Sequence, residues 1–189
     1  MRDFRRSGIN ADEPTQARIT TLRAALVKIG QQFEKTIRED VRCVEFKSSD
    51  ELRGLPVDFI AAHKPDEHGI IRVTTDYPDL KPFMAYAENS AARKELFIKF
   101  NSRAYPANES VLRALIEKRH ELAGLLGYAS WADYVTEDKM IRSGAAVQDF
   151  IDKIDAIARP KGEEDYAVLL EEKRRAEPNA ARVEEWEKS

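Results

Sequence analysis

The chain has 189 residues and a formal net charge of −3, which is enough polypeptide for one ordinary domain or a slice of a larger one. Charged residues make up 34% of it and hydrophobic residues 42%, with 8 glycines and 8 prolines, a balance typical of a helical protein with solvated faces. Because nucleic-acid binding needs a basic surface, the slightly acidic charge excludes nucleic acid as a partner. No apolar run is long enough to span a bilayer, so no membrane partner is expected.

The single cysteine, Cys43, excludes an internal disulfide and fits a reducing compartment. It lies in a run of strand-forming residues, where a half-buried structural thiol is a better interpretation than a reactive one. The first residues, Met1 to Glu13, carry charges but lack the apolar core of a signal peptide. We therefore expect a cytoplasmic protein.

A long helix is predicted from Asp12, its cap, to about Asp40, with Pro14 in its first turn. Its apolar residues recur at alternating spacings of three and four, which places them on one helix face. That heptad-like spacing predicts lengthwise packing against a neighbouring helix. The stripe runs through Ile19, Leu22, Leu26, Ile29 and Phe33 to Thr36 or Ile37.

Two runs, Val41–Phe46 and Ile70–Thr74, alternate in polarity and are rich in strand formers. We predict that they pair as a small antiparallel ribbon. Two strands alone are marginally stable, so helices must cover the ribbon. Between the strands we expect two short helical turns, the first capped by Ser48 or Ser49 and the second starting at Pro56.

Helical patterns fill the rest of the chain, which makes the predicted fold mainly α, a multi-helix array with one small two-stranded antiparallel β ribbon. Ser143 opens the last long pattern, which Pro160 and Gly162 are expected to interrupt before helix resumes from Glu163 to Glu177. One face of that pattern carries Val147, Phe150, Ile151, Ile154 and Ile157. Three helices are predicted before it. The first spans Tyr77–Glu88, and the second is capped by Ser90 and carries Leu96, Phe97 and Phe100. The third is capped by Asn108, ends at Gly127 and turns five side chains inward, those of Val111, Leu112, Leu115, Leu122 and Leu126.

Both ends of the chain resemble cuts through a larger protein. Val183 to Ser189 restart an amphipathic helix that stops within about two turns. Nothing after Trp186 completes the face that would bury this side chain, so we expect uncovered apolar surface that is open to self-association. Residues 1–10 are expected to form a poorly ordered lead-in.

The strongest candidate for chemistry is the run His120-Glu121-Leu122-Ala123-Gly124, which begins as a zinc peptidase helix motif does. That motif needs two histidines four residues apart, which chelate one ion from a shared helix face, and a glutamate as general base. Here the second histidine position is Gly124, which has no ligand atom. We interpret His120 as a solvated helix histidine.

A second histidine pair, His63 and His68, flanks a segment expected to be a loop. A metal site there would need a further ligand, such as Asp66 or Glu67, so a loop without metal is the favoured interpretation. The chain also lacks a glycine-rich phosphate loop, a serine elbow and a Cys–His pair at a suitable spacing. No catalytic, cofactor-binding or metal-binding residue is assigned.

Seven stretches of the chain, taken together and in order, resemble the thimet oligopeptidase family of zinc metallopeptidases, which includes neurolysin and oligopeptidase A. None of them is a catalytic signature, but their order over nearly the whole chain makes the match specific. They are FRRSGIN (residues 4–10), IREDV (37–41), ELRGLPVDFI (51–60), IIRVTTDYPDLKPFM (70–84), RKELFIKFNSRA (93–104), LLGYASWADYVTEDKM (125–140) and VEEWEKS (183–189).

The resemblance implies a mostly helical fold around a deep channel, with zinc at the channel floor and short peptides as substrates. It also implies that the His-Glu-x-x-His motif lies in the family's C-terminal half, outside this chain. No zinc ligand or general base is therefore carried over to any residue here. We expect residues 1–189 to form one helical segment of a zinc metalloendopeptidase or oligopeptidase, inactive by itself. Its exposed faces at Asn108–Gly127 and Ser143–Arg159 are candidates for channel wall.

A second interpretation stays open. The chain could be a stand-alone, non-catalytic helical scaffold derived from such a peptidase, which binds a peptide or a protein without cleaving it. The uncovered end at Trp186 favours the fragment, because a stand-alone module would be expected to cap it.

Overall fold

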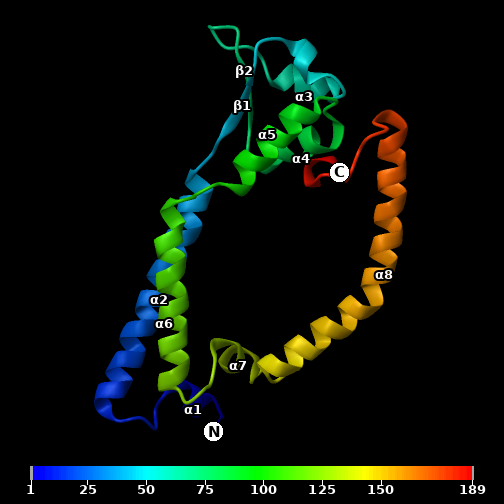
Figure 1. The fold of residues 1–189 in the computed structure, drawn as a ribbon. Coiled ribbons are helices and arrows are strands. Elements are labelled where there is room, and N and C mark those ends of the chain that lie inside the picture. Colours follow the sequence, from blue (N-terminus) through cyan, green and yellow to red (C-terminus); the bar gives the residue numbers. More distant parts are fainter. Residues whose placement is uncertain (1, 189) are drawn as a thin grey trace. The chain divides into compact units, whose positions relative to one another are not determined.

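The computed structural model describes residues 2–188 and forms the mainly helical fold with one small sheet that the sequence predicts (Figure 1). The chain divides into two compact units, each with its own apolar core. Unit 1 comprises Met1–Thr36 and Pro106–Glu164, and unit 2 comprises Ile37–Tyr105 and Asp165–Ser189. The elements, in chain order, are α1 (Arg2–Ser7), α2 (Glu13–Glu39), β1 (Cys43–Phe46), η1 (Ser49–Leu52), α3 (Val57–Ala62), β2 (Ile71–Thr74), α4 (Tyr77–Tyr86), α5 (Ser90–Asn101), α6 (Ala107–Leu125), α7 (Trp131–Thr136), α8 (Gly144–Ala176) and η2 (Glu185–Glu187).

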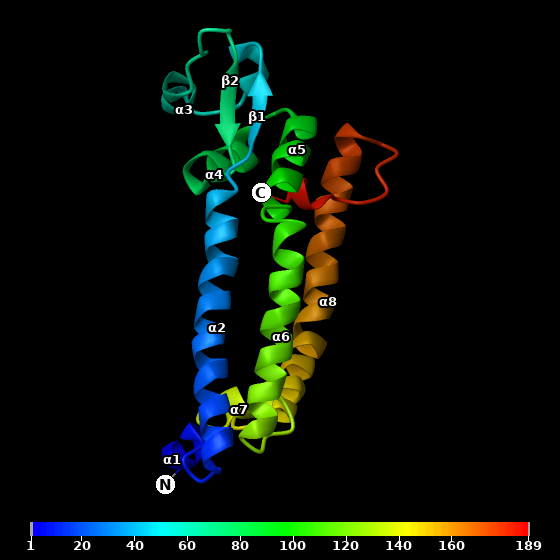
Figure 2. The same cartoon turned by 90° about the vertical axis from the view of Figure 1, so that its left-hand side faces the viewer.

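In unit 1, α2 and α6 run side by side in opposite directions (Figure 2). Ile19 and Leu22 of α2 are buried together with Leu122 of α6, and Trp131 packs against the same cluster. The heptad-like stripe of α2 thus has the neighbouring helix that its spacing predicted. At the far end of α6, Gly127 adopts a φ of 81°, which lets the chain leave the helix where the sequence predicted its end.

The start of α6 differs from the prediction. Pro106, not Asn108, is the N-terminal cap, and Asn108 lies inside the first turn with only 7% of its surface exposed. Its side-chain amide donates a hydrogen bond to the backbone carbonyl of Phe33 in α2, at 2.9 Å. A bond between helices therefore takes the place of the local cap that the residue type suggested.

Unit 2 is built on the predicted ribbon. β1 and β2 pair in antiparallel register, with Val44 opposite Val73. The strand period of two places these valines in the core, while Glu45 and Arg72 face solvent and form an ion pair at 2.8 Å. Helices α4 and α5 cover the buried side, as a two-stranded ribbon requires. The core consists of Val44, Phe46, Leu52, Leu55, Phe59, Ile71, Val73, Leu80, Phe83, Ala87, Ala92 and Leu96.

The short helices of unit 2 begin close to the predicted positions. Ser48 caps η1, and Glu51 completes a reciprocal capping box. Pro56 immediately precedes α3, in line with the prediction. The cap of α5 lies one residue earlier than predicted, because the Asn89 side chain, rather than that of Ser90, accepts the hydrogen bond from the N–H of Ala92.

Helix α8 corrects the prediction of a break at Pro160 and Gly162. It is one helix of 33 residues that passes through both positions (Figure 1). A proline inside a helix removes one backbone hydrogen bond, and here the helical turns before and after it persist. The connection before α8 contains the short helix α7, capped by the side chain of Ser130.

Each end of the chain contains a short helical element. The expected lead-in of residues 1–10 contains α1. Near the C-terminus, η2 is a 3₁₀ turn rather than the restart of an α-helix. Trp186 is half-buried, with its ring 6.2 Å from that of Phe97, and its carbonyl accepts a hydrogen bond from Arg93. The prediction that nothing covers this tryptophan was wrong, because α5, distant in sequence, supplies the cover.

Candidate functional surfaces

His120 is exposed on α6. The neighbouring Glu121 is engaged by Arg18 of α2, whose Nε donates a hydrogen bond to the carboxylate at 2.6 Å. Gly124 has open space around it and contributes no ligand atom. The residues of this run therefore do not fit a zinc site.

The side chains of His63 and His68 contact different partners. His63 lies at the end of α3, with Nδ1 2.8 Å from the carbonyl oxygen of Phe59 and Nε2 3.1 Å from Asp79. Its ring stacks on Phe59 at 4.1 Å. The exposed His68 lies near Glu67, at 3.6 Å. His63 thus belongs to the packing of unit 2, while His68 belongs to the loop.

Asp66, the further ligand that a metal site would have needed, closes the loop instead. Its carboxylate accepts hydrogen bonds from the N–H groups of Ile70 and His68 and pairs with Arg72. The bond from Ile70, followed by that from Arg72, holds the pKa of Asp66 below its ordinary value. Over residues 2–188, no group of three or more His, Cys, Asp and Glu side chains is placed to hold a metal ion.

Cys43 is half-buried at the start of β1, as predicted. Its carbonyl oxygen accepts a hydrogen bond from the Lys99 ammonium of α5 at 2.7 Å. This bond ties the ribbon to its covering helix through the backbone of the cysteine.

A polar cluster around Arg6 joins two of the stretches that carry the family resemblance. The Arg6 guanidinium donates to the carbonyl of Tyr134 at 2.7 Å and to Glu137 at 3.0 Å, and lies 3.5 Å from Asp138. Tyr128 donates a hydrogen bond to the same Glu137. Burial lowers the pKa of Arg6, but Glu137 and Asp138 outweigh it and raise the pKa above its ordinary value. We name this set, Arg6 with Tyr128, Tyr134, Glu137 and Asp138, the Arg6 cluster.

The α7 helix next to this cluster also sets the start of α8. The Asp133 carboxylate accepts hydrogen bonds from Ser130 and from the N–H of Gly144, at 2.8 and 3.0 Å. These two bonds, that from Ser130 first, lower the pKa of Asp133. A Cβ on Gly144 would come within 3.2 Å of Ala132, so the close approach of α8 to α7 favours glycine here. Sequence reasoning missed this junction, because only its α7 side lies in a stretch that carries the resemblance, residues 125–140.

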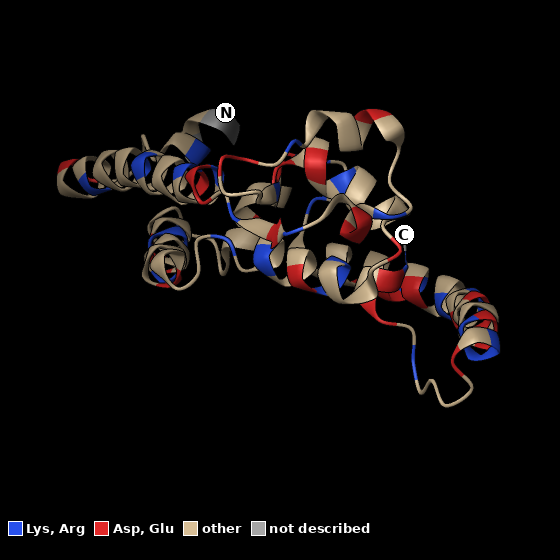
Figure 3. Cartoon of the chain, turned by 90° about the horizontal axis from the view of Figure 1, so that it is seen from above, with Lys and Arg blue, Asp and Glu red and all other residues tan. Residues whose placement is uncertain are grey.

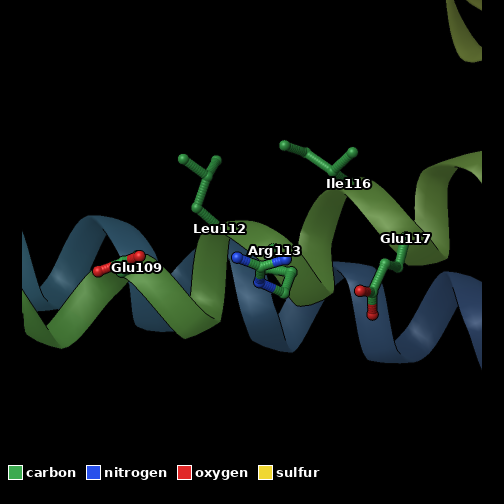
Figure 4. A pocket seen from close by; sticks show the side chains of 5 residues that line it. All are labelled: Glu109, Leu112, Arg113, Ile116 and Glu117. Atoms are coloured by element: carbon green, nitrogen blue, oxygen red, sulfur yellow. The ribbon is translucent and has the colours of Figure 1, made fainter.

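The outer face of α6 is the first of two exposed apolar surfaces in unit 1. Leu112 and Ile116 project from the same side of the helix, beside Glu109, Arg113 and Glu117, and the five residues line a shallow depression of about 450 Å³ (Figure 4). Leu112 is 43% exposed, which corrects the prediction that it faces inward. α2 packs on the side of α6 that carries Leu122, and within residues 2–188 no element buries the face with Leu112 and Ile116.

The second surface lies on α8. Over the 33 residues of this helix, none is buried. Phe150, Ile151, Ile154 and Ile157, which the sequence placed on one face, are 56%, 53%, 48% and 76% exposed. We call these four side chains the α8 stripe.

Charges do not mark a further surface. Basic and acidic residues are interspersed along the helices, as Figure 3 shows. None of the helices within residues 2–188 is both long enough and apolar enough to cross a membrane.

The sequence matches the model of Peptidase family M3 over residues 83–188. Saccharolysin of Saccharomyces cerevisiae is 28% identical over 178 residues, which cover 91% of this chain and 25% of that protein. Oligopeptidase A of Escherichia coli is 30% identical over 184 residues, covering 89% of this chain and 27% of that protein. A probable thimet oligopeptidase of Arabidopsis thaliana is 24% identical over 94% of this chain. The chain spans about a quarter of the length of these relatives. With more than half of its residues matched by the family model, this chain belongs to peptidase family M3.

Proposed function

We propose that this chain is a scaffold segment of a zinc-dependent metallo-oligopeptidase, an enzyme that hydrolyses peptide bonds in short peptides in the cytoplasm. The observation that carries the proposal is the match to family M3. The alignments support it, because they cover about nine-tenths of this chain but only about a quarter of each relative. The relatives named oligopeptidase A and probable thimet oligopeptidase point to oligopeptides as the substrate class.

The proposal assigns zinc and the catalytic groups to polypeptide outside this segment. The support is local chemistry: Gly124 stands where a second ligand would be needed, Asp66 is bound by its own loop, and His63 is held by Phe59 and Asp79. The role left for this segment is to shape and hold a channel. Selection of short peptides then follows from the channel's geometry rather than from a reactive side chain.

The face of α6 with Leu112 and Ile116 is the channel wall that we propose. Its apolar side chains lie beside one positive charge, on Arg113, and two negative charges, on Glu109 and Glu117. A wall of this composition can contact peptides of mixed sequence without demanding one side chain, as an oligopeptidase requires.

A chimera tests the proposal. The segment of E. coli oligopeptidase A that matches this chain is replaced by this chain, and hydrolysis of a short fluorogenic peptide is compared with that of a folded protein. We expect the chimera to cleave only the peptide. Ile116→Arg should lower kcat/KM for the peptide roughly tenfold with unchanged zinc content. Val27→Arg, on an exposed side chain of α2, is the matched control and should leave kcat/KM unchanged. A folded chimera that holds zinc and cleaves no peptide would contradict the proposal.

The alternative is a stand-alone helical module that binds peptide or protein without cleaving it. The observation that favours it is that unit 2 packs its own half-buried Trp186, through the Phe97 ring and a hydrogen bond from Arg93, both in α5. Calorimetric titration of the isolated chain with short peptides separates the two functions. Tight peptide binding by a monomer that unfolds in one cooperative transition would favour the module.

A further inference from the structure

The α8 stripe lies in a part of the helix that makes no core of its own. Every residue from Gln148 to Glu164 is exposed. Phe150 and Ile151 are adjacent, and Ile154 and Ile157 follow at intervals of three residues, so the four side chains form a continuous apolar face. Lys153 borders this face on one side and Asp155 on the other, which gives it no net charge bias. Its chemistry therefore suits an apolar occupant rather than a charged one.

An uncovered helix of this composition is only marginally stable. Most helices in proteins are stabilised by packing of an apolar face, and this stretch also contains Pro160 and Gly162, the two residue types that most weaken a helix interior. The C-terminal half of α8, in contrast, is contacted by other residues of unit 2. There Tyr166 hydrogen-bonds to the backbone of the buried Val183, and Lys173 pairs with Glu187 at 2.6 Å. The stretch 148–164 has no such cover within residues 2–188.

We propose that the α8 stripe is the docking face for an apolar helix surface from the part of an M3 peptidase that lies outside this segment. This inference rests on the proposed function. The relatives carry about three quarters of their length outside the region that this chain matches. In such a protein, that remaining sequence could supply the surface that covers the stripe. A covalently linked occupant also acts at a high effective concentration.

A second copy of this chain is a poorer occupant. The exposed parts of the stripe amount to roughly 400 Å², about half of the ~800 Å² that each partner buries in a stable complex. A surface of that size is sufficient for packing within one polypeptide, which does not lose the translational freedom that association costs. The stripe alone is too small to hold two free copies together.

Hydrogen exchange on the 148–164 amides tests this inference. In the isolated chain we expect fast exchange that does not change with protein concentration. In the oligopeptidase A chimera we expect the same amides to exchange about a hundredfold more slowly. Ile154→Asp, at the centre of the stripe, should remove most of that protection. Val168→Asp is the matched control, on the same helix with 66% exposure but outside the stripe, and should retain the protection.

Each other outcome has a defined meaning. Slow exchange in the dilute isolated chain would show that the stripe needs no occupant, which overturns the inference. Protection that rises with protein concentration, together with a dimer in sedimentation, would show that a second copy covers the stripe, which overturns it too. An active chimera with unprotected 148–164 amides overturns it as well, while the proposed function stands. A protected but inactive chimera counts against the proposed function alone. A chimera in which this chain fails to assemble with the remainder overturns both.

Discussion

Arg6 holds α1 against α7 through the Arg6 cluster. Its side chain is 13% exposed, and that of Glu137 is 22% exposed, so solvent screens this ion pair only partly. Removing the guanidinium would take a charged donor from the partly buried Glu137 carboxylate, to which Tyr128 still donates a hydrogen bond.

We expect Arg6→Met to lower the free energy of unfolding by about 1–3 kcal/mol, because a partly buried carboxylate loses a charged donor. Arg159→Met is the matched control, since Arg159 forms an exposed i,i+4 pair with Asp155 that contributes little. Urea denaturation of both variants measures the difference. Equal effects of the two substitutions would show that the Arg6 cluster does not stabilise the fold.

Asp40 makes the acid stability of unit 2 depend on pH. Hydrogen bonds from Arg42 and from the N–H of Ala104 outweigh partial burial and hold the pKa of Asp40 below its ordinary value of 3.8. The folded state therefore binds fewer protons than the unfolded state in acid. This contribution to stability is fully present above the ordinary value of 3.8 and is lost as the pH falls from there through the lower folded pKa.

We therefore expect Asp40→Asn to be less stable at neutral pH and to lose less further stability below about pH 4 than the unmodified chain does. Denaturation midpoints measured in steps from about pH 5 to about pH 2 show this directly. Parallel curves for the two proteins would mean that the folded structure does not shift the pKa of Asp40.

Two features favour glycine at position 54: a left-handed backbone conformation and close packing against a neighbouring segment. Its φ is 89°, and an added Cβ would collide with the backbone carbonyl oxygen of Tyr86. Gly69 has a similar φ of 76° but open space around it. We expect Gly54→Ala to destabilise the chain by about 3 kcal/mol or more and Gly69→Ala by about 1 kcal/mol, because both carry the cost of left-handed backbone and only Gly54 adds a collision. Thermal unfolding of the pair checks this order, and a reversed order would refute the packing argument.

At the scale of elements, α8 contains a defect that substitution can repair. Pro160 lacks the N–H that would bond to the carbonyl of Ala156 one turn earlier. Pro160→Ala restores this donor and removes the ring, so we expect amides around position 160 to exchange at least tenfold more slowly in the isolated chain. Gly162→Ala is a milder comparison, worth about 1 kcal/mol of helix propensity. Faster exchange in Pro160→Ala would indicate that the proline itself stabilises α8.

At the scale of the whole molecule, the zinc motif of the enzyme is expected to lie outside this segment. We expect His120→Ala in the oligopeptidase A chimera to leave both zinc content and peptide hydrolysis unchanged, because Gly124 provides no partner ligand and Glu121 is paired with Arg18. Metal analysis and steady-state rates measure this. Loss of one bound zinc in the variant would place a metal ligand in this chain after all.

Local structure followed from the sequence wherever neighbouring residues decide it. The polar alternation of β1 and β2, the cap at Ser48 and the stop at Gly127 all act within a few residues, so their patterns predicted the ribbon and these helix ends. The long stripe of α2 likewise predicted a lengthwise neighbour.

Tertiary structure alone decided what distant residues do to one another. Asn108 is bound to α2 instead of capping α6, Trp186 is covered by α5, and Arg6 meets Glu137 across most of unit 1's sequence. For the candidate surfaces, the sequence by itself determined the family and the apolar spacing of α8, whereas exposure of Leu112 became visible only in the fold. The physical reason is that a side-chain pattern defines which face of a helix is apolar, but burial depends on which other element arrives to cover that face.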